Sequence, residues 1–307
     1  MLNPLHLQTL VTVLRTGSFA DAARELGYTP SAVSQQIATL ERSLKMVLFD
    51  RSARSITPTP TARLLAERSR DSLTALRLLE EDVVTMAQGR LGTLRVGSFP
   101  TASERLLPAA FSHFRAAHPQ VQIRLGEGET DELVAQLLDG QIDVALVYRY
   151  DLVPRRIPAD VETRALLAED LLLIVPEDHE LLGRAVVAWS DLADATWITT
   201  AADTAGAQCL ERLCALAGFV PEVSMRSNDY DVVRRFVASG LGVALIPALA
   251  RGIGEGLGVA PLEASEVRRH VLVLHRHERL NPAVAGFLAS LAHAASQVCG
   301  EHLRPAG

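Results

Sequence analysis

The sequence predicts three regions: a small helical region with a β-hairpin, one long helix, and a larger α/β region built as two lobes. Three observations predict this organisation. Residues 18–44 contain two short helices with capping signals, residues 60–88 carry an apolar stripe at helical spacing, and from residue 92 onward β-rich runs alternate with amphipathic helices. The expected boundaries are 1–59, 60–89 and 91–307.

The first short helix is delimited at both ends by residues suited to capping. Ser18 is a good N-cap, and Asp21 follows at the position of a capping-box partner. Gly27 stands where the C-terminus of a helix favours a residue that can adopt a left-handed conformation. The small side chains of Ala22 and Ala23 allow close approach of the next helix.

The second short helix begins at Thr29, a suitable N-cap, with Pro30 in its first turn, where the missing N–H costs nothing. Its inward face is apolar at Val33, Ile37 and Leu40. Its outward face is short, uncharged and able to hydrogen bond, whereas a solvated helix face is usually rich in Lys and Glu. Two such helices are typical of a helix-turn-helix, whose second helix enters the DNA major groove.

Residues 48–59 form a short turn-rich segment, which predicts a β-hairpin wing lying along the phosphate backbone. Arg51 and Arg54 flank its turn and supply positive charge there. Serine and glutamine side chains can contact base edges or phosphates, and an alanine can touch a thymine methyl group. The candidate DNA contacts are Ser18, Thr29, Ser31, Ala32, Ser34, Gln35, Arg51, Arg54 and Thr57.

The net charge of −6 argues at first against DNA binding. The charge is unevenly distributed, however, because residues 1–65 carry seven basic and four acidic side chains, a net charge of +3, and the remainder carries −9. Local charge governs contact with phosphates. The basic excess therefore lies in the region where the helix pair predicts DNA contact.

The long helix carries apolar residues on one stripe for about eight turns before Gly89. So long a helix cannot bury its stripe alone, and we expect it to pair with a second copy of the chain. A helix that packs on its own domain is the alternative.

The α/β region contains two sets of strands and helices. The first set has the βαβαβ order that is typical of a parallel sheet. It comprises strands over 94–97, 121–125 and 143–148 and helices over 103–118 and 131–138. The second set comprises strands over 171–175, 196–199, 222–226 and 243–246 and helices over 207–217 and 230–239, followed by a strand over 271–274 and a helix over 283–298.

Two sets of similar size predict two lobes with a cleft between them. We expect lobe one over about 91–161 plus 268–307, and lobe two over about 162–267. The chain would cross between the lobes near 149–161 and again near 267–271. Two crossings make a hinge, as in periplasmic solute-binding proteins.

Ligands of open α/β sheets bind at the carboxyl ends of strands, beside helix N-termini. A helix starting near Ser103 would supply N–H groups and a positive dipole end, which favour a carboxylate or an aromatic acid. A plain helix cap is the other interpretation of Ser103 and of Thr101. The candidate ligand contacts are Ser98, Thr101, Ala102, Ser103, Thr130, Val147, Tyr148, Thr199, Thr200 and Ile246.

The first 90 residues resemble the LysR-type transcriptional regulators. The resemblance rests on residues 17–19, 22–26, 31–37, 40–41, 48–51 and 57–59, which are spaced as in that family without gaps. It continues through segments such as 106–108, 143–145, 240–242 and 246–247, and so covers nearly the whole chain. Pro30 stands where the family often has a polar residue, a change that removes one polar contact to DNA.

The resemblance implies a winged helix-turn-helix, a linker helix that dimerises, and a two-lobed effector domain like the periplasmic binding proteins. It implies binding to double-stranded operator DNA with inverted half-sites, by dimers assembled into a tetramer. It also implies a small-molecule effector and no cofactor. Thr101 and Thr130 align with positions that the family uses for effectors.

A small-molecule binding protein whose N-terminal part serves oligomerisation only remains the alternative function. The sequence has no Gly-rich phosphate loop and no Gly-x-Ser-x-Gly elbow, so we expect no catalytic residue and no enzyme activity. His275 and His277 share one face of a strand, but no third ligand is placed by the sequence, and no metal site is expected.

The three cysteines, Cys209, Cys214 and Cys299, are scattered. The first two lie about 140° apart around a predicted helix and cannot form a disulfide without melting it. No run of about 18 apolar residues and no signal segment is present, so we expect a cytoplasmic protein with no membrane contact. The sequence does not indicate which effector, which target genes, or whether binding activates or represses.

Overall fold

The computed structural model describes residues 2–52, 55–87, 92–252, 256–263, 266–276 and 281–305. Contacts within the chain divide it into a unit formed mainly by Met1–Thr93 and a larger unit formed by Leu94–Leu137 and Ile142–Gly307. Each unit is described by itself. None of the helices in the described ranges is long and apolar enough to cross a membrane.

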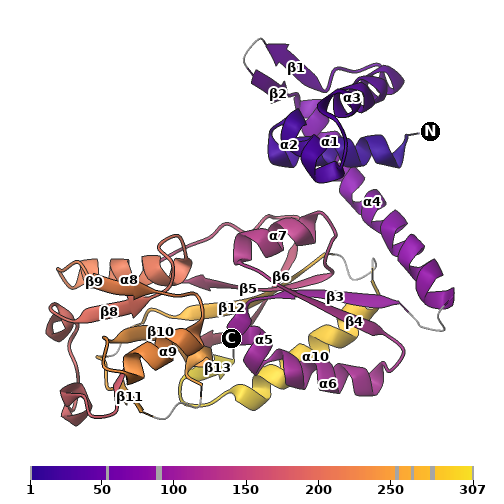
Figure 1. The fold of residues 1–307 in the computed structure, drawn as a ribbon. Helices are drawn as coiled ribbons and strands as arrows, with labels where there is room; N and C mark the ends of the chain where they lie inside the picture. Colours follow the sequence, from indigo (N-terminus) through magenta and orange to yellow (C-terminus); the bar gives the residue numbers. More distant parts are fainter. Residues whose placement is uncertain are drawn as a thin grey trace. The chain divides into compact units, whose positions relative to one another are not determined.

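The N-terminal unit has the predicted winged helix-turn-helix fold (Figure 1). Its elements are α1 (Pro4–Thr16), α2 (Phe19–Leu26), α3 (Pro30–Leu44), the hairpin β1 (Phe49–Ser52) and β2 (Ser55–Pro58), and the long α4 (Pro60–Ala87). The three short helices bury one apolar core. Its fully buried side chains include Leu10, Ala22, Val33, Ile37 and Leu40.

Capping side chains fix where these helices begin. The hydroxyl of Ser18 accepts a hydrogen bond from the Asp21 N–H at 3.3 Å, and that of Thr29 accepts from the Ala32 N–H at 3.2 Å. Gly27 ends α2 with a φ of 70°, a left-handed conformation that a glycine adopts without strain. The caps therefore set the turn between the two helices, as the sequence predicts.

The long helix α4 has two distinct halves. Near its start, Ala62 and Ala66 are buried against the core, and α4 packs on α1. Further along, Leu76, Leu79 and Val83 are exposed at spacings of three and four residues, which places them on one side of the helix. The first half thus packs on its own domain, whereas the second half presents an exposed apolar stripe.

Lobe one of the larger unit is built on a six-stranded sheet with the strand order β13-β6-β12-β5-β3-β4. Strands β3 and β5 are parallel, whereas β12 runs antiparallel to both of its neighbours, β5 and β6. The strands are β3 (Thr93–Ser98), β4 (Gln122–Glu127), β5 (Val144–Tyr150), β6 (Glu162–Glu169), β12 (Arg269–His275) and β13 (Leu303–Pro305). The helices are α5 (Pro100–Arg105), α6 (Leu107–Ala117), α7 (Thr130–Leu138) and α10 (Ala283–Val298).

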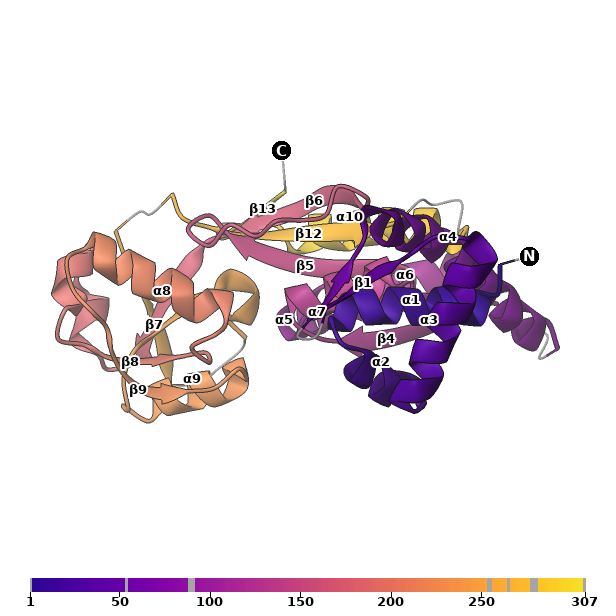
Figure 2. The same ribbon diagram turned by 90° about the horizontal axis from the view of Figure 1, so that it is seen from above.

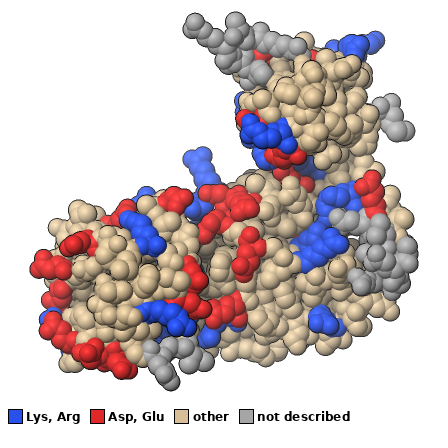
Figure 3. Space-filling view, viewed as in Figure 1, with Lys and Arg blue, Asp and Glu red and all other residues tan. Residues whose placement is uncertain are grey.

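Lobe two contains a three-stranded antiparallel sheet of order β10-β7-β11 and a parallel pair, β8 and β9. Its elements are β7 (Leu171–Pro176), β8 (Thr196–Thr199), α8 (Ala205–Leu216), β9 (Glu222–Arg226), α9 (Tyr230–Ala238), β10 (Ala244–Pro247) and β11 (Leu257–Ala260), with short 3₁₀ turns at Glu180–Gly183, Trp189–Leu192 and Ala248–Ala250. Figure 2 shows the two lobes side by side, joined by strands that cross between them. On the face in Figure 3, acidic side chains gather over lobe two.

The structure differs from the sequence prediction at the first crossing. Strand β6 was not predicted, and because it pairs with β12 in the lobe-one sheet, the chain leaves lobe one at Asp170 rather than near 149–161. Lobe two therefore starts at about 171, not 162. The first four side chains of β6 are exposed, so no apolar run marks the strand.

The helix expected over 103–118 also differs. It starts three residues earlier, at Pro100, and is interrupted at Leu106 to give α5 and α6. Pro108 lies in the first turn of α6, where its missing N–H is tolerated, whereas inside a continuous helix the ring would remove a hydrogen bond. Ser103 consequently lies inside α5 and does not start a helix.

Candidate functional site

The outward surface of α3 carries the polar side chains that the sequence analysis selects for DNA contact. Thr29, Ser31 and Gln35 are exposed, and Ala32 and Ser34 are partly buried. The Thr29 hydroxyl lies 3.0 Å from the Ser31 hydroxyl while it caps the helix. The structure therefore groups hydroxyl and amide donors and acceptors on the N-terminal half of α3, the part of a recognition helix that reaches base edges.

Two side chains that face away from this surface hold α3 in place. Gln36 accepts a hydrogen bond from the Thr9 hydroxyl at 2.6 Å, which joins α3 to α1. Glu41 accepts from the backbone N–H groups of Leu48 at 2.7 Å and Phe49 at 3.2 Å, which fixes the start of the wing against α3. Adjacent glutamines in this helix thus have different surroundings: Gln35 faces solvent and Gln36 faces α1.

The wing exists as predicted, and its register pairs Asp50 with Thr57 and Arg51 with Ile56. Thr57 is exposed. The side chain of Arg51 and the whole of Arg54 lie outside what the structure describes, so their phosphate contacts stay predictions. Ser18 uses its hydroxyl as a helix cap.

A small cavity lies between the two lobes, at the carboxyl ends of strands β3, β4, β5, β8 and β9. We call it the cleft, and its open volume is about 60 Å³. Its position is the one expected for ligands of α/β sheets. It is lined by Phe99, Pro100, Thr101, Glu129, Tyr148, Tyr150, Thr200, Thr204, Gly206, Asn228, Tyr230 and Arg269.

Arg269 lines one wall of the cleft and belongs to a buried ion pair. Arg269 is 2% exposed, and its Nε donates to Oε1 of the fully buried Glu169 at 2.5 Å. The other carboxylate oxygen of Glu169 accepts the backbone N–H of Leu249 at 2.8 Å. Burial is the largest single influence on the pKa of the Arg269 guanidinium and lowers it, but the Glu169 carboxylate and the hydroxyls of Tyr150 and Tyr230 together raise the pKa above its ordinary value. Arg269 therefore stays charged.

The same guanidinium also contacts the other residues of this wall. One Nη2–H of Arg269 donates to the Thr101 hydroxyl at 2.8 Å. The guanidinium carbon lies 5.1 Å from the ring centroid of Phe99 and 5.2 Å from that of Tyr148, within the range of cation–π attraction. Arg269 therefore joins β12 to the start of α5 and to β5.

Tyrosine and threonine side chains make up much of the rest of the cleft wall. Tyr148 donates to Oε2 of Glu129 at 2.7 Å, and burial together with the Glu129 charge raises the pKa of the Tyr148 hydroxyl. A Cβ on Gly206 would lie 3.2 Å from the Thr200 hydroxyl oxygen and 3.5 Å from that of Tyr150. Gly206 thus keeps open a small space into which neighbouring hydroxyls face.

The predicted ligand contacts fall into three groups. Thr101, Tyr148 and Thr200 line the cleft. Thr199 and Ile246 line a smaller adjoining cavity of about 10 Å³. The remaining five do not line the cleft: Ser98, Ala102, Ser103, Thr130 and Val147.

Thr130 does not line the cleft, and its hydroxyl bonds to the backbone of Tyr148 instead. Its hydroxyl donates to the Tyr148 carbonyl at 3.2 Å and accepts from the Tyr148 N–H at 3.4 Å, so it ties α7 to β5. Val147 lies one residue from Tyr148 on β5 and therefore faces the other side of the sheet. Both residues support the cleft without lining it.

Four residues in and beside the cleft were not predicted from the sequence: Arg269, Glu169, Tyr150 and Tyr230. Arg269 begins an antiparallel strand, so the rule that selects carboxyl ends passes over it, and Glu169 ends a strand that was not predicted. Tyr150 could have been found, because a residue two places after Tyr148 shares its face of the strand.

No cluster of three or more His, Cys, Asp or Glu side chains that could hold a metal occurs among the described residues. His275 is fully buried and its Nδ1 contacts the Arg276 carbonyl at 2.8 Å, while His277 lies outside the described residues.

Glu169→Gln tests the buried pair, because it keeps the size of the side chain and removes the charge that compensates Arg269. We expect the free energy of unfolding at pH 7 to fall by about 3–5 kcal/mol, measured by urea denaturation with circular dichroism. Asp170→Asn is the matched control: its pair with Arg268 is partly exposed, and its loss should cost less than about 1 kcal/mol. Equal losses in the two variants would contradict the importance of burial.

Comparisons with known proteins agree with both units. Residues 5–63 match the family model "bacterial regulatory helix-turn-helix protein, lysR family", and residues 87–296 match "LysR substrate binding domain". The chain is 33% identical over 243 residues to the transcriptional regulator ShiR of Corynebacterium glutamicum, covering 78% of this chain and 80% of that protein. It is 28% identical to a hydrogen peroxide-inducible genes activator of Dickeya chrysanthemi, covering 90% of each.

A solved structure shows the same fold. Full-length CbnR in complex with its target DNA superposes with a TM-score of 0.57 at 23% identity, covering 95% of this chain and 100% of that one. The winged helix-turn-helix, the two-lobed domain and the two family models together show that the chain belongs to the LysR family of DNA-binding transcriptional regulators with an effector-binding domain.

Proposed function

We propose that this regulator changes its DNA binding when a small carboxylate that carries hydroxyl groups occupies the cleft between the two lobes. One observation carries the proposal: a buried, permanently charged guanidinium, that of Arg269, lines a cavity whose other polar groups are mostly hydroxyls. Planar N–H donors of an arginine suit a carboxylate, and hydroxyls suit the hydroxyl groups of the same molecule.

The charges of the cleft favour a carboxylate that carries hydroxyl groups over an anion without them. Glu169 already balances Arg269, and Glu129 adds a further negative charge at the Tyr148 end of the cleft. A purely anionic guest would be repelled there, whereas a hydroxyl group can donate to Glu129. At the other end, the first turn of α8 with its cap Thr204 supplies the positive end of a twelve-residue helix.

Because the cleft is small, a ligand can bind there only if the two lobes move apart. About 60 Å³ has room for only a few water molecules, so a hydroxy acid requires the lobes to part. The hinge strands that carry Glu169 and Arg269 are the elements between the lobes. A ligand that binds the parted lobes better than the closed ones shifts the population toward the parted form.

The remaining assignments follow the family. We propose that α3 and the wing bind double-stranded operator DNA with inverted half-sites, and that α4 pairs two chains into dimers that assemble into a tetramer. The exposed stripe of Leu76, Leu79 and Val83 supports the pairing. A regulator of this kind acts in the cytoplasm, where the DNA is, and needs neither a cofactor nor an enzymatic step.

Two of the three cysteines, Cys209 and Cys214, are poor candidates for a peroxide response like that in the name of the Dickeya relative. Cys209 and Cys214 are buried, and burial raises the pKa of each thiol to about 12. A thiol must ionise to react, so neither is a good peroxide target near pH 7. Both lie on α8, five residues apart, where a disulfide cannot form without melting the helix.

Gln35→Ala should relax base preference at one position of each half-site, at a cost of about 1–3 kcal/mol, because the exposed amide can pair with a base edge. Sequence selection with purified protein measures the preference. Gln36→Ala is the control: its amide faces Thr9, so it should lower the melting temperature and leave the preferred sequence intact. Identical selected sequences for wild type and Gln35→Ala would exclude Gln35 as a base reader.

Gly206→Ala should abolish the effector response, because the added methyl group enters the space between the Thr200 and Tyr150 hydroxyls. The probe is a thermal-shift panel of hydroxy acids (glycerate, malate and gluconate) beside their amides, followed by calorimetry of the acid that stabilises most. Thr101→Val should weaken its binding by about 1–2 kcal/mol through the lost hydrogen bond.

Gly126→Ala is the control for this experiment, because a Cβ there meets nothing within 4 Å. It should bind the acid as wild type does. Stabilisation by none of the acids would contradict the proposed class of ligand, and equal binding by Gly206→Ala and wild type would place the bound acid outside the cleft.

Leu76→Asp should dissociate the dimer, because it puts a charge into the proposed seam between two α4 helices. Light scattering after size exclusion measures the mass. Leu216→Asp, at a leucine of α8 that is 75% exposed, is the control and should leave the mass unchanged. A folded Leu76→Asp protein of wild-type mass would rule out the α4 pairing.

A further inference from the structure

A second, larger cavity lies at the hinge, outside the cleft; we call it the back cavity. Its volume is about 430 Å³, within the range of small-molecule sites. Most of its wall is apolar and comes from lobe two, including Leu173, Trp189, Leu213 and Leu262. Among the residues that the structure describes, none lines both this cavity and the cleft.

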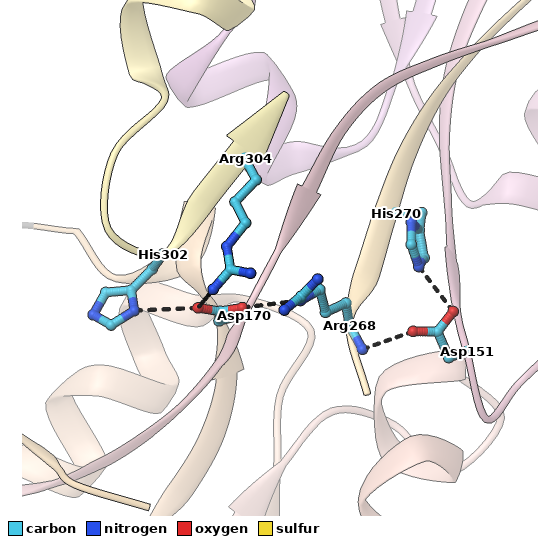
Figure 4. Close-up of polar contacts among 6 residues, drawn as sticks. All are labelled: Asp151, Asp170, Arg268, His270, His302 and Arg304. Atoms are coloured by element: carbon cyan, nitrogen blue, oxygen red, sulfur yellow. Dashed lines mark hydrogen bonds and ion pairs between the residues drawn. The ribbon is translucent and has the colours of Figure 1, made fainter. Parts of the chain in front are cut away.

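The position of the back cavity follows from side-chain alternation on the two hinge strands. Glu169 and Arg269 are paired across β6 and β12, and Arg269 lines the cleft. Their chain neighbours Asp170 and Arg268 therefore point to the opposite side, and both line the back cavity. There the Nε of Arg268 donates to Oδ1 of Asp170 at 3.2 Å (Figure 4). Each face of the hinge thus has its own arginine–carboxylate pair.

Two arginines and a histidine surround Asp170 at one end of the back cavity. Besides Arg268, Asp170 has Arg304 Nη2 at 3.9 Å and His302 Nδ1 at 3.5 Å (Figure 4). His302 adds a positive charge only when it is protonated, and its Nε2 also lies 4.0 Å from Oε2 of Glu301. His302 precedes β13 and Arg304 belongs to it, and this strand pairs with β6 in the lobe-one sheet. The contact of Arg304 is the longest of the three, and half of its side chain is exposed.

Two other acids near this end bond to other partners. Asp151 accepts from the backbone N–H of Arg268 at 3.0 Å and from the ring of His270 at 2.8 Å, so it does not pair with the Arg268 guanidinium (Figure 4). Glu263 lines the lobe-two wall, where its Oε1 accepts the backbone N–H of Trp189 at 3.2 Å. The cavity is therefore apolar along one wall and basic at one end.

We propose that the back cavity is a second ligand site, for a monocarboxylic acid whose apolar body has the size of an aromatic ring or a short acyl chain. The carboxylate pairs with Arg304 and Arg268, and the body lies against Trp189 and the leucines. Because the basic end belongs to lobe one and the apolar wall to lobe two, an occupant contacts both lobes at once. It therefore acts on the same hinge as a ligand in the cleft, from the other side.

The test uses the full-length chain and 4-iodobenzoate, with the neutral 4-iodobenzamide beside it. Iodine quenches tryptophan fluorescence on contact, and of the two tryptophans Trp189 lines the back cavity while Trp197 is fully buried. We expect saturable quenching by the acid and not by the amide. Trp189→Phe should abolish the quenching and keep the binding heat.

Arg304→Gln should weaken binding of the acid at least fivefold, and His302→Gln provides a second change at the same end. Arg115→Gln, at an exposed arginine of α6, is the matched control and should bind as wild type does. Absence of saturable quenching at millimolar acid, or equal affinity in Arg304→Gln and Arg115→Gln, would each overturn the proposal.

Discussion

The ion pair between Arg269 and Glu169 is the interaction on which the effector domain depends. Two opposite charges removed from water are costly unless they are paired and hydrogen bonded, and here both are: Glu169 through Arg269 and the Leu249 N–H, Arg269 through Glu169, Thr101 and two aromatic faces. These contacts bring together β6, β12, the start of α5 and the turn after β10. The pair fixes the hinge end of lobe one and at the same time furnishes the cation of the cleft.

The hinge consequently has two faces with different physical character. On the cleft side the charges are buried, balanced and surrounded by tyrosines. On the other side Asp170 and Arg268 are partly exposed and share their surroundings with two further basic groups from the end of the chain. Because both pairs belong to the same two strands, any movement that parts the lobes acts on both faces. A ligand that parts the lobes at the cleft is therefore expected to change the back cavity as well, through movement of the backbone of β6 and β12.

Local signals explain what the sequence could predict. Caps and helical spacing placed the helix-turn-helix correctly, and the strand Glu222–Arg226 and the helix Ala283–Val298 were predicted with the bounds that the structure has. Strand β6 escaped because its exposed first half carries no apolar alternation. Missing that strand also hid Glu169, and without its partner Arg269 looked like part of a polar connection. The best-connected residue of the cleft therefore depends on a pairing between distant segments, which no local pattern encodes.

The separation of Glu169 and Arg269 along the chain affects how the effector domain folds. Glu169 and Arg269 lie 100 residues apart in the chain, and all of lobe two is made between them. Lobe two is continuous and can fold as soon as it leaves the ribosome, whereas the lobe-one sheet waits for β12 and β13. Until they arrive, β5 and β6 have open edges and Glu169 has no counter-charge. Contacts of such long sequence separation slow folding. Completion of lobe one is therefore expected to be the slow step of folding and the stage at which the chain is most prone to aggregation.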